Sequence, residues 1–466
     1  MAAHIPSTGK AQVRALLGLL NTAVEEAIAE YDKQGLDVPS IDHGYAHPMD
    51  GRLPSLKFKH AIRTLEGACG QICATLAQPS HTMVNYSMNA FVPAAINAAI
   101  RADIAERLSK HPNGLHVNDL AKETSIHPQK LGTLMRLLVT NHCFREVSSN
   151  VFANNRLSLT MSPNNGNKVC DILELKSGEM HRKATMWLYE ALTDPDFGPT
   201  YNATRSPLMY ALGKEGYSGT LYEYLNTQPG VVESFANAMV GYRSATGHLN
   251  LLNVFPWGTL PPSTSVCDLG SGNGNISIEI SKHFPQLKIT LQDLPETIRE
   301  ARKAGPPSTE YPEAINEGRV TFTPLDFFKE SPVPGQDIYY LSQIFHNWGD
   351  EHSLTLLKNI RRVMVPGSRM LIDDYLAVHL DPASIEKQHT SMSRAPRPLS
   401  PGFGQGQSRT YTQDFCMLIM CNARERSLED FIELCAAADL KFRRWLLHLS
   451  TSAAYDTSTA LHVKIT

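Results

Sequence analysis

Strand-like and helix-like segments alternate from Ser265 to the C-terminus, and this alternation restricts the possible folds more than any other feature of the chain. Five apolar runs with the composition of buried strands occur in order, at 265–270, 288–294, 320–328, 337–345 and 368–376. Helical patterns separate these runs. Such alternation specifies a parallel sheet with helices on both faces, so the sequence predicts an α/β fold with a doubly wound sheet.

A glycine-rich turn follows the first of these strands, in the stretch VCDLGSGNGNISIEI that begins at Val266. Its glycines are Gly270, Gly272 and Gly274. A turn of this kind can hold a dinucleotide, a phosphate or an adenosyl group, or it can be structural only. Asn275 stands where a dinucleotide fingerprint has its last glycine, which disfavours a nicotinamide cofactor. Asp268 would repel a pyrophosphate but would suit a cationic ligand.

Two further acids end the next two strands. Asp293, in LQDLPE, can accept hydrogen bonds from a ribose diol. Asp326, in PLDFF, can accept a hydrogen bond from an adenine amino group beside Phe327. Three acids at successive strand ends therefore predict a site for a positively charged adenosyl ligand, which is S-adenosylmethionine.

These motifs, with FHNWGDEH at 345–352, resemble the plant and fungal small-molecule O-methyltransferases of the caffeate/flavonoid type. The resemblance covers about Ala90 to the C-terminus. It implies a Rossmann-like class I methyltransferase sheet and an N-terminal helical and winged-helix dimerisation domain. It also implies cofactor contacts from Asp268, Gly270, Gly272, Asp293, Leu294, Asp326, Phe327 and Ser342. Ser342 stands where the family often has lysine or arginine, so the cofactor contact of that longer basic side chain is absent.

The resemblance also implies the catalytic residues. The histidine of the HNW motif is the general base in that family, which assigns this role to His346, with Glu425 and Asp374 as its orienting carboxylates. Glutamate is commoner at the position of Asp374 in the family. Because aspartate is one methylene shorter, its carboxylate reaches less far toward the base. Trp348 and Met239 are expected to contact the acceptor, although Met239 is equally compatible with packing in a helix interface. No metal ligand is expected.

The N-terminal half is helical and includes a winged-helix pattern that begins near Leu115. Two helical segments precede a hairpin whose turn is Ser148–Asn150. The second helix carries leucines instead of a row of basic residues, so DNA binding is not expected. The family resemblance implies a homodimer whose N-terminal segments close the partner's substrate pocket. The expected domains are 1–240 and 241–466, with a flexible Pro/Ser/Gly/Gln-rich insertion near 380–411.

Composition narrows the class of protein further. A net charge of −3 in 466 residues provides no general attraction to nucleic acid or anionic membranes. The eight cysteines include no C-x-x-C pair, so buried free thiols in a reducing compartment are expected. No apolar run approaches the roughly 20 residues that span a bilayer. These features predict a cytoplasmic protein, and the family resemblance implies that it is an enzyme acting on a small aromatic molecule.

The combined prediction is S-adenosylmethionine-dependent O-methylation of a phenolic secondary metabolite, such as a polyketide. A non-methylating, pericyclase-like reaction on the same fold is an alternative, which His346 and Glu425 disfavour. Two other classes stay open: a winged-helix regulator, disfavoured by the near-neutral second helix, and a nicotinamide oxidoreductase, disfavoured by Asn275 and Asp268.

Overall fold

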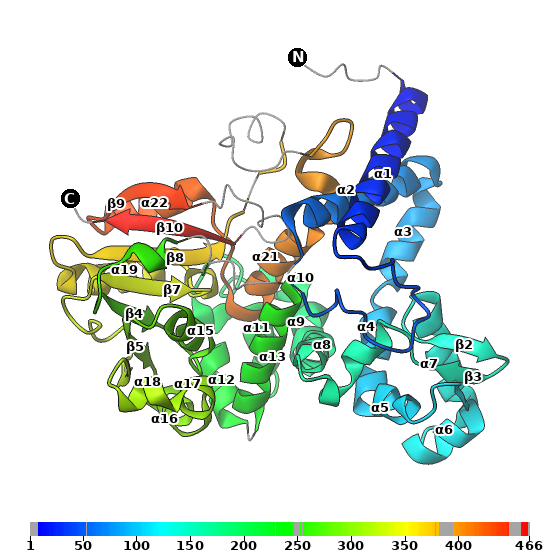
Figure 1. The fold of residues 1–466 in the computed structure, drawn as a ribbon, viewed down its shortest axis with the longest axis horizontal. Coiled ribbons are helices and arrows are strands. Elements are labelled where there is room, and N and C mark those ends of the chain that lie inside the picture. The colour runs from blue at the N-terminus through cyan, green and yellow to red at the C-terminus, as the bar shows by residue number, and fades with distance from the viewer. Residues whose placement is uncertain are drawn as a thin grey trace. The chain divides into compact units, whose positions relative to one another are not determined.

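The chain is described by a computed structural model, in which it forms two compact units (Figure 1). The described residues are 8–52, 54–228, 230–246, 252, 255–377, 379–381, 395–446 and 458–464. The first unit comprises Met1–Lys183, Gln228–Gly247 and Arg394–Gln407, and the second comprises Ala184–Thr227, His248–Ser393 and Ser408–Thr466. The functional division expected at residue 240 stays a prediction, because compactness divides the chain at several points.

The second unit is built on a seven-stranded sheet with the order β6-β5-β4-β7-β8-β10-β9. The strands are β4 (Ser265–Leu269), β5 (Lys288–Asp293), β6 (Val320–Pro324), β7 (Ile338–Ser342), β8 (Arg369–Tyr375), β9 (Lys441–Leu446) and β10 (Ser458–Lys464). Strands β4 to β8 are parallel, which confirms the predicted α/β, Rossmann-like architecture. Strand β10 pairs antiparallel with both β8 and β9, a reversal that the alternating pattern does not predict.

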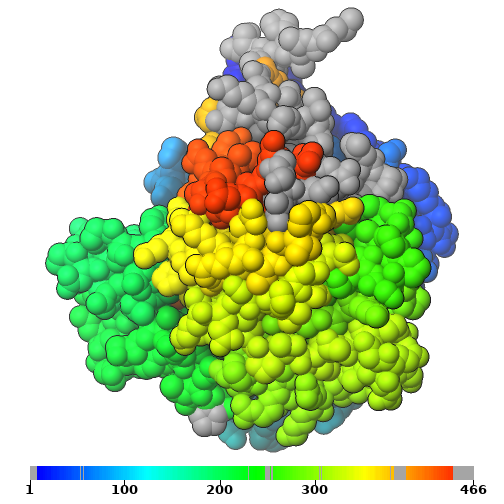
Figure 2. Space-filling model, turned by 90° about the vertical axis from the view of Figure 1, so that its left-hand side faces the viewer, coloured from blue at the N-terminus to red at the C-terminus, as the bar shows by residue number. Residues whose placement is uncertain are grey.

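Helices cover both faces of this sheet. They are α15 (Asn275–His283), α16 (Pro295–Ala304) and α18 (Pro312–Asn316) on one face, and α19 (Asp350–Val363) and α22 (Leu428–Ala437) on the other. Successive side chains of β7 alternate between the faces: Ile338 and Tyr340 pack with the first group, and Tyr339 and Leu341 with the second. The yellow surface of α19 adjoins the orange-red surface of α22 in Figure 2. Because both faces are buried, the strand ends are the places where the sheet can meet a ligand.

The remaining elements of the second unit lie before the sheet or in its connections. They are α10 (Leu188–Thr193), η3 (Ala203–Arg205), α11 (Pro207–Gly213), α12 (Leu221–Thr227), η5 (Trp257–Thr259), α17 (Pro306–Glu310), η6 (Phe345–Asn347) and α21 (Ser408–Cys421). Helix α9 (Glu179–Met186) spans the division between the units.

The first unit is mostly helical. Its helices are α1 (Gly9–Asp32), α2 (Leu56–Leu76), α3 (Pro79–Met88), α4 (Phe91–Arg101), α5 (Ile104–Ser109), α6 (Val117–Thr124), α7 (Pro128–Thr140), η1 (Ser158–Met161), η2 (Pro163–Asn165), α8 (Val169–Ser177), α13 (Val231–Thr246) and η7 (Pro401–Gln407). Strands β1 (Leu115–His116), β2 (Arg145–Ser148) and β3 (Val151–Ala153) form an antiparallel sheet beside α6 and α7. This arrangement confirms the winged-helix pattern, and the buried Leu131 and Leu138 of α7 belong to its core.

The insertion expected to be flexible has a folded part. Residues 382–394 lie outside the described residues, but 395–407 form a segment, including η7, that packs on α2 (Figure 1, orange). The buried Arg63 donates to Gln407 Oε1 at 2.5 Å, and its guanidinium lies 4.1 Å from the ring centre of the buried Phe403. The 395–407 segment of the insertion therefore packs on the first unit, and the flexibility of the insertion stays a prediction.

Small residues explain why this segment is ordered. A Cβ atom added at Gly406 would overlap the carbonyl oxygen of Arg63, and one added at Gly67 would overlap the carbonyl oxygen of Phe403. Gln71 also accepts a hydrogen bond from the N–H of Ser400, at 2.7 Å. Gly406 of the insertion and Gly67 of α2 thus allow the two backbones to touch.

Two other expectations concern cysteines and membranes. Five of the eight cysteines are buried, but Cys69 and Cys73 are exposed on α2, so the expected burial is wrong for these two. Within the described ranges, no helix combines the length and the hydropathy needed to cross a membrane.

Candidate active site

Five strands end at one edge of the sheet in the second unit, because β4 to β8 run in the same direction. Most of the residues that the sequence singles out lie at or just after these ends. They are Asp268, Gly270 and Gly272 with β4, Asp293 and Leu294 with β5, Asp326 and Phe327 with β6, Ser342, His346 and Trp348 with β7, and Asp374 with β8. Ligands bind at this edge in doubly wound sheets. The topology thus brings the predicted residues to one candidate site.

The glycine turn has the backbone conformation that glycine favours. Gly270 and Gly272 have φ values of 71° and 57°, in the left-handed region. A Cβ atom at Gly270 would overlap the side chain of Ile344, whereas one at Gly272 would meet no atom of the described residues within 4 Å. Gly272 therefore leaves open space through which a ligand can approach the backbone.

Polar groups around this turn fit an adenosyl ligand. Asp293 accepts hydrogen bonds from the N–H groups of Gly272 and Leu294, at 2.8 and 2.7 Å. Burial raises the pKa of Asp293. Asp268 is buried and accepts from the hydroxyl of Ser277 at 2.6 Å. The buried hydroxyl of Ser271 has no hydrogen-bond partner among the described residues, so it is available to a ligand group or a water molecule.

Asp326 is engaged by its own neighbours. Its carboxylate accepts from the N–H of Phe328 at 3.1 Å and pairs with the exposed Lys329 at 2.8 Å. Phe327 packs edge-to-face on Phe328, with ring centres 4.7 Å apart. The predicted contact of Asp326 and Phe327 with an adenine stays a prediction.

Ser342 is bound to an acid that the sequence analysis missed. Its hydroxyl donates to Asp373 Oδ2 at 3.2 Å, and the hydroxyl of Tyr340 donates to the same oxygen at 2.9 Å. Burial raises the pKa of Tyr340 well above its usual value. Asp373 could have been identified as a partner of these hydroxyls because it is an acid inside an apolar strand. The family resemblance assigns a role only to the neighbouring Asp374.

His346 lies on η6, directly after β7, and is only 7% exposed. Its Nδ1 atom is 2.9 Å from Oε1 of Glu425, a residue 79 positions later that is 2% exposed. The imidazole also stacks on Tyr375, with ring centres 6.3 Å apart. The N–H of Glu425 donates to Asp414 at 2.8 Å, which fixes the loop that carries the carboxylate. The structure thus brings together the two residues that the family resemblance pairs.

Asp374 supports the same turn differently. Its Oδ2 atom accepts a hydrogen bond from the N–H of Phe345 at 3.1 Å, and its buried Oδ1 atom has no partner among the described residues. Burial raises the pKa of Asp374 to about 7, although the neighbouring His346 opposes the shift. Its described hydrogen bond therefore holds the backbone next to the base instead of the imidazole.

We expect Asp374→Asn to stabilise the protein increasingly from about pH 4 to pH 7. Because the pKa is raised, the native state keeps a proton that the unfolded chain releases above about pH 4. The carboxyl group therefore lowers the free energy of unfolding more and more as the pH rises to about 7, and this cost is constant at higher pH. The gain in the free energy of unfolding should reach roughly 1–4 kcal/mol at pH 8. Denaturant titrations at several pH values measure it, and an effect independent of pH would contradict the assignment.

Trp348 belongs to an aromatic cluster beside the base. It stacks on Tyr222 and His352, with ring centres 5.7 Å apart in each case, and meets the edge of Phe328 at 4.6 Å. His352 belongs to the same FHNWGDEH motif as Trp348, whereas no sequence motif marks Tyr222 as a neighbour. The acceptor contact expected of Trp348 stays a prediction.

Met239 lies on α13 and is half-buried. This helix belongs to the first unit. Its expected contact with the acceptor also stays a prediction.

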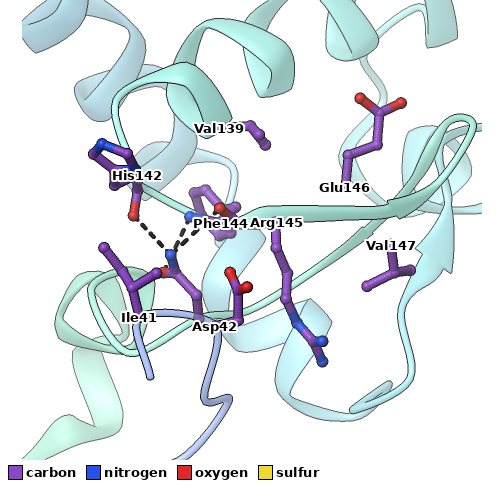
Figure 3. Close-up of a pocket in the computed structure, with 9 residues that line it drawn as sticks. Ile41, Asp42, Val139, His142, Phe144, Arg145, Glu146 and Val147 are labelled. Carbon is purple, nitrogen blue, oxygen red and sulfur yellow. Dashed lines mark hydrogen bonds between the residues drawn. The ribbon is translucent and has the colours of Figure 1, made fainter. Parts of the chain in front are cut away.

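A separate cavity of about 400 Å³ lies in the first unit (Figure 3). Its lining combines Ile41 and Asp42 with residues of the winged-helix segment: Val139, His142, Phe144, Arg145, Glu146, Val147 and Asn155. The amide of Asn155 donates to the carbonyl oxygens of His142 and Phe144. None of the predicted site residues lines this cavity, and its charges are mixed, so it does not resemble a basic nucleic-acid surface.

Comparisons with known proteins identify the family of the chain. The chain matches the O-methyltransferase domain family at residues 203–396 and the O-methyltransferase dimerisation domain family at residues 84–163. It is 35% identical to "3-O-methyltransferase 2" of Phanerochaete chrysosporium over 436 residues, covering 93% of this chain and 94% of the relative. It is 26% identical to "4-O-methyltransferase 1" of the same fungus, covering 90% and 92%.

A solved structure described as "A Pericyclic Reaction enzyme" shares the fold, with a TM-score of 0.67 and 18% identity over 87% of this chain and 95% of that one. This likeness concerns the fold alone. The two family matches and the relative that is similar along almost the whole chain go further. They place the chain in the class I S-adenosylmethionine-dependent O-methyltransferase family.

Proposed function

We propose that this enzyme transfers a methyl group from S-adenosylmethionine to the phenolic hydroxyl of a small aromatic secondary metabolite, with His346 as the general base. One observation carries the proposal: a buried imidazole is hydrogen-bonded to a buried carboxylate beyond the end of β7, the strand next to the glycine turn. A base and its orienting acid in this position meet the need of a transferase that must deprotonate its acceptor.

The cofactor would be held by the chain around the glycine turn. S-adenosylmethionine supplies an electrophilic methyl group on a positively charged sulfur. The carboxylate of Asp293 would accept from the ribose hydroxyls while it keeps the N–H of Gly272 in place. Asp268 provides negative charge for the cationic part of the ligand. The unsatisfied hydroxyl of Ser271 offers one more hydrogen bond.

His346 would remove the acceptor proton during methyl transfer and not before it. A free phenol has a pKa near 10 and an imidazole one near 6.5, so full deprotonation beforehand is unfavourable. Glu425 engages Nδ1, which leaves proton acceptance to Nε2. The same carboxylate stabilises the imidazolium that forms.

The names of the relatives guide the choice of acceptor. Two are named after the oxygen that they methylate, as 3-O- and 4-O-methyltransferases. We therefore propose a ring with neighbouring hydroxyl groups, for which 3,4-dihydroxybenzoate is a simple probe. The aromatic cluster around Trp348 offers flat apolar side chains near the base.

The test is incubation with methyl-labelled S-adenosylmethionine and a panel of hydroxylated benzoates, cinnamates and simple polyketide phenols. Label in the product, with release of S-adenosylhomocysteine, supports the proposal. Conversion of an acceptor without label would favour the alternative, a pericyclase-like reaction on the same fold. Failure of every phenol, with transfer of label to a carbon or nitrogen acceptor, would overturn the phenolic assignment.

We also expect a homodimer assembled through the first unit. The dimerisation family match begins within α3 and includes its second half, and this helix has no buried residue. Apolar side chains are exposed on and around this helix, namely Leu76, Met83, Val84, Tyr86, Met88 and Phe91. Unpaired apolar surface of this kind marks an interface. Light scattering at micromolar concentration should give twice the chain mass of 51.5 kDa.

A matched pair of variants tests the dimer surface. Met83→Glu combined with Val84→Asp should give monomers, because both charges would be buried in the interface. Val365→Asp, at an exposed apolar residue of the second unit, should leave the dimer intact. A wild-type protein with the mass of one chain would contradict the expectation.

A further inference from the structure

Arg426, the residue after Glu425, holds the backbone of the turn that carries His346. Its side chain is 1% exposed. Nη1 donates to the carbonyl oxygen of Phe345 at 2.6 Å, and Nη2 donates to that of Trp348 at 2.7 Å. These two carbonyl groups flank His346 on both sides. One guanidinium therefore spans the turn from end to end.

The same guanidinium is anchored to the next helix. Nε and Nη2 both donate to Oδ1 of Asp350, at 3.0 and 2.7 Å. Asp350 is the first residue of α19. A planar group with five N–H donors can bind two carbonyls and a carboxylate at once, which a lysine ammonium cannot do in this geometry.

The backbone of Arg426 is fixed as well. Its carbonyl oxygen accepts from the N–H of Ala377 at 2.9 Å, just after β8, and Leu376 forms a bridge with it. The following residue, Ser427, caps α22 with a reciprocal hydrogen-bond pair to Asp430. Neighbouring side chains of an extended segment point to opposite sides. Glu425 accordingly reaches the imidazole while Arg426 reaches the backbone behind it.

We propose that Arg426 is a positioning residue for the methyl transfer. It holds the turn that carries His346 in the place where the imidazole meets Glu425. This inference rests on the proposed function of His346. Burial of a guanidinium has a large desolvation cost, which hydrogen bonds and an ion partner must offset. Here those partners are the two carbonyls that define the orientation of the base and the aspartate that begins α19. Removal of the guanidinium would take the shorter hydrogen bond from each carbonyl and free the turn to shift. Phe345 would keep only the N–H of Trp348, at 3.2 Å, and Trp348 only the hydroxyl of Ser353, at 3.3 Å.

The test compares Arg426→Ala with a control on the same loop. Arg424 pairs with Asp350 and Asp430, but its side chain is 38% exposed and bonds to neither carbonyl of the turn. With labelled S-adenosylmethionine and the best phenol of the panel, Arg426→Ala should lower kcat about 10²-fold, the effect of a misplacement near 1 Å. Affinity for S-adenosylhomocysteine should stay within about twofold, and Arg424→Ala should retain near wild-type kcat.

Chemical rescue separates positioning from a general loss of structure. Guanidinium chloride at about 10–50 mM, far below the molar concentrations that unfold proteins, should restore part of the kcat of Arg426→Ala. It should not restore that of His346→Gln. Wild-type kcat in Arg426→Ala, or an unrescued loss accompanied by loss of S-adenosylhomocysteine affinity, would overturn the inference. Full activity in His346→Gln would instead refute the proposed base.

Discussion

His346→Gln should lower turnover by about 10²–10⁴-fold, with almost no change in the affinity for S-adenosylmethionine. Glutamine keeps much of the size and some of the hydrogen bonding of histidine but cannot accept the proton. The loss of turnover should exceed that of Glu425→Gln. The Glu425 variant keeps the base and loses only the buried contact with Nδ1 that orients the imidazole. The acidic limb of the pH profile of turnover should disappear in the His346 variant.

The exposed His283 provides the control. Its ring bonds to the carbonyl of Glu279 on its own helix, α15, so His283→Gln should leave turnover unchanged. Near-normal turnover of His346→Gln on a confirmed acceptor would show that the base is elsewhere or that the phenol reacts as a preformed phenolate. A loss of cofactor affinity equal to the loss of turnover would point to a binding role instead.

The second large effect is expected for Asp293→Ala, which should weaken binding of S-adenosylhomocysteine by about 1.5–3 kcal/mol. This corresponds to a roughly 10- to 150-fold rise in the dissociation constant. The carboxylate has two tasks, since it would bind the ribose and it also receives the N–H of Gly272. Isothermal titration calorimetry measures the change directly.

Asp337 offers a matched carboxylate at the opposite edge of the sheet. It accepts from the backbone N–H and the hydroxyl of Ser265, at 2.8 Å each, where β4 begins. Asp337→Asn should therefore affect stability but not cofactor affinity. Unchanged affinity in Asp293→Ala would remove this residue from the cofactor site, and equal losses in both variants would indicate a general effect on the sheet.

Much of the sheet could be predicted because its information is local. The apolar runs of β4 to β8 and the helical patterns between them each occupy a short stretch of chain, and alternation implies parallel pairing. Strand β10 pairs antiparallel with β8 and β9, and no local pattern in the sequence indicates this direction. The packing of the 395–407 segment could not be predicted for a related reason, because its glycines suggest flexibility and no local pattern shows that α2 lies against it.

The candidate site shows the same limit. His346 and Glu425 could be paired only through the family resemblance, since 79 residues separate them. Asp374 was expected to orient the imidazole, whereas its described hydrogen bond goes to a backbone N–H. Arg426 was missed because two of its partners are backbone carbonyls, which are present at every residue and leave no trace in the sequence. The identities of side chains therefore predict the chemistry of a site better than they predict the backbone hydrogen bonds that fix its loops.

The contact between α2 and the 395–407 segment has a consequence for the order of events during synthesis. Arg63 and Gln407 are 344 residues apart, so the hydrophobic cluster of Leu16, Ala68, Leu399 and Phe403 cannot close until most of the chain has left the ribosome. At about 5–20 residues per second, this delay is roughly 17–70 s. The N-terminal helices must wait through that interval with apolar surface and a cation uncovered. The nascent chain is therefore vulnerable to aggregation in its N-terminal helices, which are completed by a segment synthesised more than 300 residues later.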